Sequence, residues 1–168
     1  MSLPLLRAGI AMGSNIEPCL ERLQEAIEFL RGLNEEAPFL LSSIYKTEPV
    51  DCEPGTPPFL NAVAEISTSL GPRELLHRLQ TFEILQGRPE DHGKNTPRTM
   101  DLDILYVGTR TSSDPDLILP HPRAAERAFV MVPLAEIRPT LTLPGQAETV
   151  QTLSSRLKSE DLQVILCP

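Results

Sequence analysis

Two aspartates stand two residues apart in the segment TMDLDILYV, residues 99–107. The segment alternates with a period of two, which predicts a β-strand with Met100, Leu102, Ile104 and Tyr106 on one face and Asp101, Asp103, Leu105 and Val107 on the other. Two adjacent carboxylates on an apolar strand repel one another and cost free energy to desolvate. A divalent cation would relieve both costs, and carboxylates at this spacing can share two cations about 3.5–4 Å apart.

The chemistry of this pair favours Mg²⁺. The ligands are hard oxygens with no cysteine close by, and Mg²⁺ completes its coordination with water and substrate phosphates. The alternative is a solvated strand face on which paired acids have no function. Leu105 and Val107 continue the same face with apolar side chains, and Arg98 lies just upstream, which favours a partly sheltered cleft. The segment therefore predicts a site for metal-bound phosphate.

A third carboxylate departs from the pattern of the helix predicted between Gly71 and Gly87. At about 100° per residue, the apolar stripe of this helix consists of Leu75, Leu76, Leu79 and Phe82. Glu83 falls within the stripe, which directs a carboxylate toward the core. The alternative is a glutamate whose stem lies on apolar neighbours and whose head stays in water. The polar segment that follows, GRPEDHGKNTPR, is typical of a functional or disordered loop.

The elements that position these residues follow the order β-α-β-β-α-β. A strand over 7–12 precedes a helix that starts near Pro18, and two strands are expected over 39–47 and 61–68. The helix that carries Glu83 and the strand that carries the aspartates complete the order. This is the order of a ferredoxin-like α+β sandwich, in which helices cover one face of a mostly antiparallel sheet and leave the other for ligands.

A C-terminal extension follows this unit. It contains strand-like segments near Leu117 and Val130, a helix around 150–158 and a last strand over 163–167. The sequence contains neither a P-loop motif nor a dinucleotide-binding fingerprint, so neither a P-loop phosphate site nor a dinucleotide-binding fold is expected.

The composition predicts one domain over residues 1–168, since 168 residues with 40% hydrophobic and 23% charged are enough for one core and few for two. The net charge of −8 argues against nucleic-acid binding, which needs a basic surface. No apolar run reaches membrane-spanning length, and three cysteines without close pairing are typical of reduced thiols. We therefore expect a cytoplasmic protein with no membrane or nucleic-acid partner, as a monomer or weak homodimer.

Several motifs together resemble one enzyme family. In chain order they are GIAMGSN, SSIYKTEPV, PPFLNAV, FEILQGR, PRTMDLDIL and LILPHPRAAERAFVMVPL. This pattern resembles 6-hydroxymethyl-7,8-dihydropterin pyrophosphokinase of folate biosynthesis. The resemblance implies the ferredoxin-like fold already expected, ATP and a pterin as substrates, two Mg²⁺ ions, and transfer of pyrophosphate from ATP to the pterin hydroxymethyl group with release of AMP.

The resemblance also implies roles for individual residues. On the phosphate side, Asp101 and Asp103 match the metal ligands, and Arg88 and Arg98 match loop arginines that stabilise the transferred charge. Further nucleotide contacts are implied for Gln80, Glu83, Arg98, Ile104, His121 and Arg127. On the pterin side, Phe59 and Phe129 match two rings that enclose the substrate, and Asn61 matches the amide that reads its edge. Additional pterin contacts are implied around Thr47, Pro49 and Val50.

Some positions depart from the family pattern. Asp116, Ile118 and Pro122 replace polar or aromatic nucleotide contacts of some members, and Glu90 stands where some carry an arginine. Two other functions share part of the pattern. A two-metal nucleotidyltransferase would keep the Asp101 strand but would release pyrophosphate and would not need Phe59, Asn61 and Phe129. A ferredoxin-like module that binds a small ligand without chemistry would not need Asp101.

Overall fold

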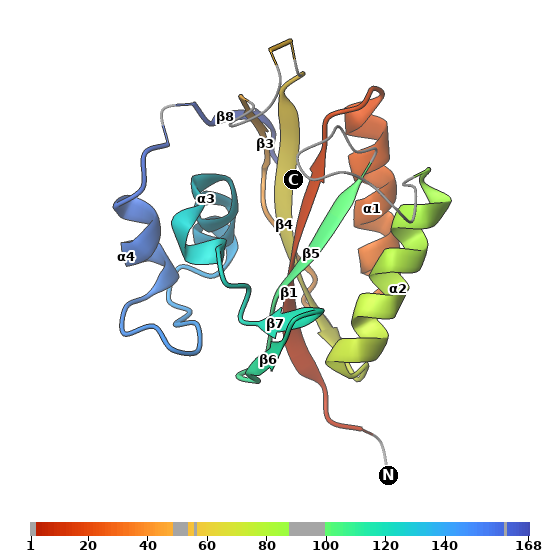
Figure 1. Ribbon diagram of the computed structural model, residues 1–168, viewed down its shortest axis with the longest axis vertical. Helices are drawn as coiled ribbons and strands as arrows, with labels where there is room; N and C mark the ends of the chain where they lie inside the picture. Colours follow the sequence, from red (N-terminus) through yellow and green to blue (C-terminus); the bar gives the residue numbers. More distant parts are fainter. Residues whose placement is uncertain (1–2, 49–53, 56, 88–99, 160) are drawn as a thin grey trace.

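The computed structural model describes residues 3–48, 54–55, 57–87, 100–159 and 161–168. A six-stranded antiparallel sheet with the order β5-β1-β4-β3-β8 forms its centre, and β2 pairs with β4 beside β3 (Figure 1). The strands are β1 (Leu6–Ser14), β2 (Leu40–Leu41), β3 (Ile44–Thr47), β4 (Phe59–Thr68), β5 (Asp101–Val107) and β8 (Gln163–Leu166). The order confirms the predicted ferredoxin-like sheet. The segment expected as one strand over 39–47 is divided into β2 and β3.

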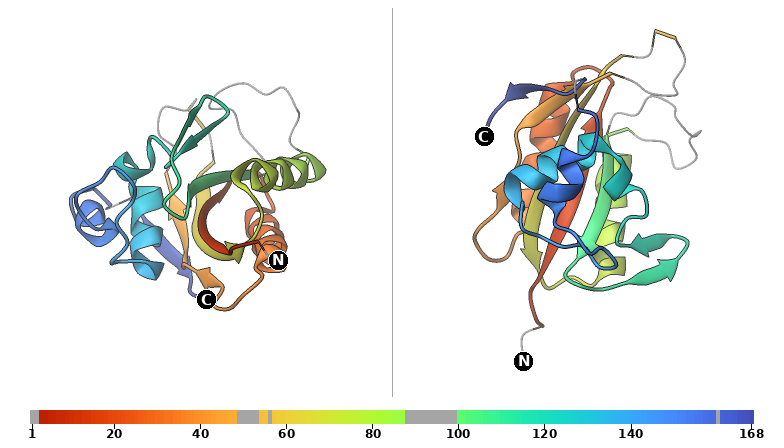
Figure 2. Two further views of the ribbon diagram at one scale, coloured as in Figure 1. Left: turned by 90° about the horizontal axis from the view of Figure 1, so that it is seen from below. Right: turned by 90° about the vertical axis from the view of Figure 1, so that its left-hand side faces the viewer.

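Helices α1 (Cys19–Leu33) and α2 (Pro72–Leu85) cover one face of this sheet (Figures 1 and 2). Apolar residues recur along α1 at helical spacing, so one side of it is buried, as Cys19, Leu23, Ala26, Ile27 and Leu30. The rings of Phe29 and Phe82 stack with centroids 4.4 Å apart and join the two helices. This side of the sheet holds the larger of the two hydrophobic clusters, and both helices agree with the sequence prediction.

The opposite face, which the predicted fold leaves for ligands, is partly covered by the C-terminal extension. A 3-10 turn (Ala124–Glu126) leads into α3 (Ala128–Ile137), and α4 (Val150–Ser155) packs outside α3 (Figure 2). The strand-like segment predicted near Val130 is therefore wrong, because Val130 lies in α3. Its continuous apolar run does not distinguish a buried helix from a strand by periodicity. Here the run is buried between the sheet and α4.

Strand β5 does not keep its alternation to the end. The register with β1 shifts between Gly9 and Ile10, which pair with Tyr106 and Ile104, so Leu105 is the extra residue of a β-bulge. After the bulge, Tyr106 packs in the smaller hydrophobic cluster, which includes Val130, Met131 and Leu134 of α3 and is called the α3-side cluster. Val107 packs in the larger cluster beside α1 and α2, called the α1/α2-side cluster, so both residues lie on the reverse of their predicted faces. A Cβ at Gly9 would lie 2.3 Å from Cε1 of Tyr106. The tyrosine ring therefore occupies the space that the glycine leaves.

Below α3, a buried glutamate links three elements. Glu65 on β4 is 0% exposed, and its carboxylate accepts from Arg7 Nε at 2.7 Å, from Arg138 Nη1 at 2.5 Å and from the Tyr106 hydroxyl. Burial and the neighbouring Glu65 raise the pKa of Tyr106, so the phenol stays neutral and donates. A buried charge is tolerated when it is paired and hydrogen-bonded, as Glu65 is. This cluster lies at the end of the sheet opposite to the aspartates.

The rest of the extension flanks the sheet. Strands β6 (Ser112–Asp114) and β7 (Leu117–Leu119) form a hairpin, and Asp114 pairs with Arg73 at the start of α2. The strand predicted near Leu117 and the last strand, found as β8 beside β3, are confirmed, and the helix expected around 150–158 is shorter, as α4. In the part of the chain that the structure describes, no helix is long and apolar enough to cross a membrane.

Candidate active site

The register of three neighbouring strands brings together two groups that are far apart in the sequence. Asp101 on β5 lies opposite Gly13 on β1, and Gly13 lies opposite Asn61 on β4. On the next strand, Tyr45 lies opposite Asn61. Directly opposed residues point to the same face of a sheet, here the α3 face. The aspartate predicted to bind metal and the asparagine predicted to read a pterin edge therefore share one row.

Gly13 leaves the middle of this row without a side chain. A Cβ at this position would lie 3.0 Å from Oδ1 of Asn61, so the amide of Asn61 lies directly over the glycine backbone. The other end of the amide is also fixed, because Nδ2 of Asn61 donates to Oγ1 of Thr47 at 2.8 Å. Asn61 and Thr47 are 7% and 8% exposed. The amide is thus held in one orientation before any ligand binds.

Asp101 and Asp103 lie on the α3 face as predicted, because the bulge in β5 comes after them. Both are half-buried, whereas the intervening Leu102 and the following Ile104 are buried in the α1/α2-side cluster. Among the described residues, no three His, Cys, Asp or Glu side chains are arranged so that they could hold one metal ion together. The pair is therefore a two-carboxylate set, which suits a cation that takes its other ligands from water and phosphate.

Two side chains from the segment after β7, His121 and Arg127, lie close enough to this pair for their pKa values to respond to it. Burial lowers the pKa of Arg127, and the adjacent Arg123 lowers it further, while Asp103 and Asp101 oppose the shift. Burial and Arg127 likewise lower the pKa of His121 from its ordinary 6.5, and Asp101 opposes this. These couplings show that the five side chains share one electrostatic environment. His121 and Arg127, which the resemblance predicts as nucleotide contacts, thus lie close to the predicted metal ligands.

The backbone fixes the orientation of His121. Its N–H donates to the Leu105 carbonyl at 2.8 Å, which attaches the segment to β5 at the bulge. Its Nδ1 accepts from the Arg123 N–H at 3.2 Å, so we assign the proton of the neutral ring to Nε2. A neutral His121 therefore presents an N–H donor to a ligand, and its lowered pKa favours this form.

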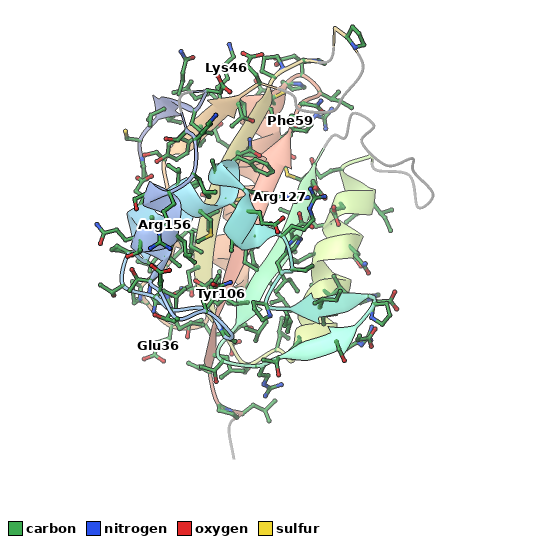
Figure 3. The ribbon with its side chains drawn as sticks, turned by 60° about the vertical axis from the view of Figure 1, so that its left-hand side comes forward. Glu36, Lys46, Phe59, Tyr106, Arg127 and Arg156 are labelled. Atoms are coloured by element: carbon green, nitrogen blue, oxygen red, sulfur yellow. The ribbon has the colours of Figure 1, made fainter. Side chains whose placement is uncertain are left out.

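The aromatic residues expected around a pterin lie at the same end of the sheet. Phe59, at the start of β4, is opposite Thr47 and on the same face as Asn61. Phe129 lies in the first turn of α3 and is 38% exposed, and Cζ of Arg127 lies 5.6 Å from the centre of its ring. Figure 3 shows Phe59 and Arg127 toward the upper end of the sheet and Tyr106 toward the lower end.

Three other expected nucleotide contacts, Glu83, Gln80 and Ile104, have their side chains on the α1/α2 side of the sheet. Glu83 is buried on α2, and its Oε2 accepts from the Leu102 N–H at 3.3 Å, directly beneath the position between the two aspartates. Its placement toward the core confirms the prediction from the apolar stripe. Gln80, one turn earlier on α2, is exposed. The side chain of Ile104 is buried in the core, so only its backbone is accessible to a ligand at the edge strand.

Four expected residues lie outside the described part of the chain: Arg88, Arg98, Pro49 and Val50. Two residues of the site, Gly13 and Arg123, were not predicted from the sequence. Gly13 was considered only as the end of a strand, although a glycine inside a strand can indicate a close approach of another group. Arg123 gave no signal, because its relation to His121 depends on the turn at residues 121–123.

The sequence also matches a known protein family. The family model of 7,8-dihydro-6-hydroxymethylpterin-pyrophosphokinase matches residues 9–139. This chain belongs to that family. The family span includes every described site residue named above, from Gly13 to Phe129, and the resemblance stated from the motifs is confirmed.

Relatives and solved structures agree with the family. The 2-amino-4-hydroxy-6-hydroxymethyldihydropteridine pyrophosphokinase of Pseudomonas aeruginosa is 39% identical over 149 residues, covering 89% of this chain and 91% of the relative. The protein of the same name from Bacillus subtilis is 44% identical over 130 residues, 77% of each chain. The crystal structure of Plasmodium falciparum HPPK-DHPS, with SDX-DHP, superposes with a TM-score of 0.72 at 12% identity, which shows the fold. The superposition covers 90% of this chain and 44% of the Plasmodium falciparum chain.

Proposed function

We propose that this pyrophosphokinase-family chain carries out its reaction on the α3 face of the sheet, along the row from Asp101 through Gly13 to Asn61. The reaction transfers pyrophosphate from ATP to the hydroxymethyl group of 6-hydroxymethyl-7,8-dihydropterin. The observation that carries the proposal is the strand register, which sets the acidic pair and the fixed amide one strand apart on each side of Gly13. An ATP triphosphate over Asp101 and a pterin over Asn61 would then meet above the glycine.

The phosphate side is assigned to the acidic pair and the cations that face it. Asp101 and Asp103 would hold Mg²⁺, which when bound supplies positive charge to the phosphates of ATP. Arg127 and Arg123 would contact phosphate oxygens directly, since a guanidinium is a permanent, forked donor. His121 would donate from Nε2. The loop arginines Arg88 and Arg98 are assigned the same kind of contact by the family pattern. The family pattern also assigns nucleotide contacts to Gln80 and Glu83 on α2 and to Ile104, which would contribute its backbone.

The pterin side is assigned to Asn61, Thr47 and the two rings. Phe59 and Phe129 would bury the faces of the flat heterocycle, a stacked arrangement worth about 0.5–1.5 kcal/mol per ring beyond burial. Asn61, held by Thr47, would offer its amide to the donors and acceptors at the pterin edge. Pro49 and Val50 follow Thr47 in the chain and are assigned backbone contacts at the same edge. A site that hydrogen-bonds such groups rejects analogues that lack them.

The reacting groups balance without a dedicated base. The hydroxymethyl oxygen forms a bond to the β-phosphorus, the bond from that phosphorus to the α–β bridging oxygen breaks, and AMP leaves with that oxygen. The hydroxyl proton passes to solvent or to a phosphate oxygen. Positioning and fixed positive charge therefore supply the catalysis. The chain is expected to act as a monomer or weak homodimer in the cytoplasm.

Separate titrations of the two substrates test this division. Phe129→Ala and Asn61→Ala should weaken pterin binding, measured by calorimetry, and leave the affinity for ATP almost unchanged. Asp101→Asn should weaken Mg²⁺-dependent ATP binding and spare the pterin. If both substrates were affected equally by every variant, or if pterin affinity stayed at the wild-type value in both Phe129→Ala and Asn61→Ala, the assignment would be wrong.

A further inference from the structure

One carboxylate outside the proposed pterin site connects the two walls of that site, which are the strand wall with Asn61 and Thr47 and the helix wall with Phe129. Glu136, in the last turn of α3, accepts three hydrogen bonds from β3 and the residue before it: from the Ser43 N–H at 3.0 Å, from the Ser43 hydroxyl at 2.7 Å and from the Tyr45 hydroxyl at 2.7 Å. Ser43 and Tyr45 are 4% and 7% exposed. Burial raises the pKa of Tyr45, and the bond to Glu136 raises it further, so the phenol remains a donor. Hydrogen bonds to a charged acceptor are the stronger kind.

Both walls of the proposed pterin site begin at this junction. On the strand side, Tyr45 lies opposite Asn61 in the register of β3 and β4, and Thr47, which holds the amide of Asn61, is the next residue on the same face. On the helix side, Phe129 precedes Glu136 by seven residues. Seven residues are almost two full turns, so the two side chains lie on one face of α3.

The rest of α3 agrees with this orientation. Its opposite face is buried in the α3-side cluster through Val130, Met131 and Leu134, whereas Phe129 and Glu136 are exposed in part. At its start, Arg127 faces Asp101 and Asp103, on the β5 side of the sheet. At its end, Glu136 is bound to β3. The helix is therefore attached at both ends. Arg138, directly after α3, also holds the end near Glu136 by its pair with Glu65, and the hydrogen bonds of Glu136 act on the helix face that carries Phe129.

We infer that Glu136 is a positioning residue for pterin recognition: through Ser43 and Tyr45 it fixes the rotation of α3, and so directs the ring of Phe129 toward the wall that carries Asn61 and Thr47. The inference rests on the proposed function, since it assumes that Phe129 contacts the pterin. Without the carboxylate, α3 would keep its apolar packing, and Phe129 would sample other directions. Pterin affinity would fall because the ring is no longer held in place before binding.

A double-mutant cycle tests this directly. Glu136→Ala should raise the dissociation constant for the pterin about ten-fold, in the range seen for coupled residues, and change that for ATP less than two-fold. In a Phe129→Ala background the same substitution should have less than about a two-fold effect, because there is no ring left to position. Glu136→Gln, which keeps one acceptor oxygen, and Tyr45→Phe should give smaller losses of the same kind.

Control variants separate positioning from general damage. Glu148→Gln removes a carboxylate that pairs with Arg156 beside α4, away from β3, and should leave both affinities unchanged. Equal losses for ATP and pterin, or additive losses in the double mutant, would overturn the inference. If Glu136→Ala does not fold, the milder Glu136→Gln and Tyr45→Phe variants give the same comparison. A Phe129→Ala variant with wild-type pterin affinity would instead refute the proposed function.

Discussion

A methyl group added at Gly13 probes the centre of the candidate site. In Gly13→Ala the new Cβ would lie 3.0 Å from Oδ1 of Asn61, and ordinary contacts begin near 3.4 Å, so the amide must move by a few tenths of an ångström. That shift strains the 2.8 Å bond from Asn61 to Thr47. A buried donor that loses its partner costs about 1–3 kcal/mol, which is the upper limit of the damage. Alanine offsets part of this, since glycine in a strand costs about 0.5–1 kcal/mol relative to alanine.

The two effects predict different outcomes for stability and for binding. The free energy of unfolding, measured in urea, should change by no more than about 2 kcal/mol. Pterin affinity should fall about ten-fold, equal to about 1.4 kcal/mol, because the displaced amide is the group that reads the substrate. ATP affinity should change little, since the described atoms within 4 Å of the added Cβ are Oδ1 of Asn61 and the Leu60 carbonyl oxygen, and none belongs to Asp101.

Gly32 provides the matched control. It lies in α1, and a Cβ there would meet nothing within 4 Å. Gly32→Ala should therefore raise stability by up to about 1 kcal/mol and leave both affinities unchanged. Wild-type pterin binding by Gly13→Ala, measured by calorimetry beside this control, would refute the assignment of Asn61.

Other parts of the molecule give further predictions. Asp101→Asn or Asp103→Asn should abolish Mg²⁺-dependent turnover and leave pterin affinity within two-fold of wild type; full activity in either variant would exclude a metal role. Glu65→Gln removes the charge that pairs with Arg7 and Arg138 and should cost about 2–4 kcal/mol of unfolding free energy, whereas Tyr106→Phe removes one donor and should cost about 0.5–1.5 kcal/mol; the opposite ranking in urea unfolding would contradict the network. The Ser69 N–H and hydroxyl hold the pKa of Glu35 below its ordinary 4.5, so its contribution to stability is present above pH 4.5 and is lost as the pH falls through the lower native value. Glu35→Gln should therefore flatten the acid limb of a stability-against-pH curve. An unchanged limb would show that the hydrogen bonds from Ser69 to the Glu35 carboxylate do not contribute to stability.

The periodicity of the sequence predicted which side chains share a face, but not which strands lie opposite one another. Asp101 and Asp103 were placed correctly because a strand alternates with a fixed period of two. The alternation fails at Tyr106, because the bulge depends on contact with Gly9, almost a hundred residues earlier in the chain. Such a contact has no local signal.

The same limit applies to the row that forms the site. Each of Asp101, Gly13 and Asn61 is recognisable within its own strand, but their alignment is set by pairing between strands far apart in the sequence. The helix α3 was missed for a local reason. Its run AFVMVPLAEI is apolar and contains valines and a proline, which favour a strand or a loop, and only burial between the sheet and α4 explains the helix.

The products of a single reaction test the central claim most directly. Purified protein with Mg²⁺, ATP and 6-hydroxymethyl-7,8-dihydropterin should form AMP and the pterin diphosphate in equal amounts, followed by phosphorus NMR, with neither ADP nor free pyrophosphate as a primary product. Release of pyrophosphate with an adenylated product would identify a nucleotidyltransferase. Binding of the pterin without consumption of ATP would identify a non-catalytic module. Either result would contradict the transfer of pyrophosphate to the pterin.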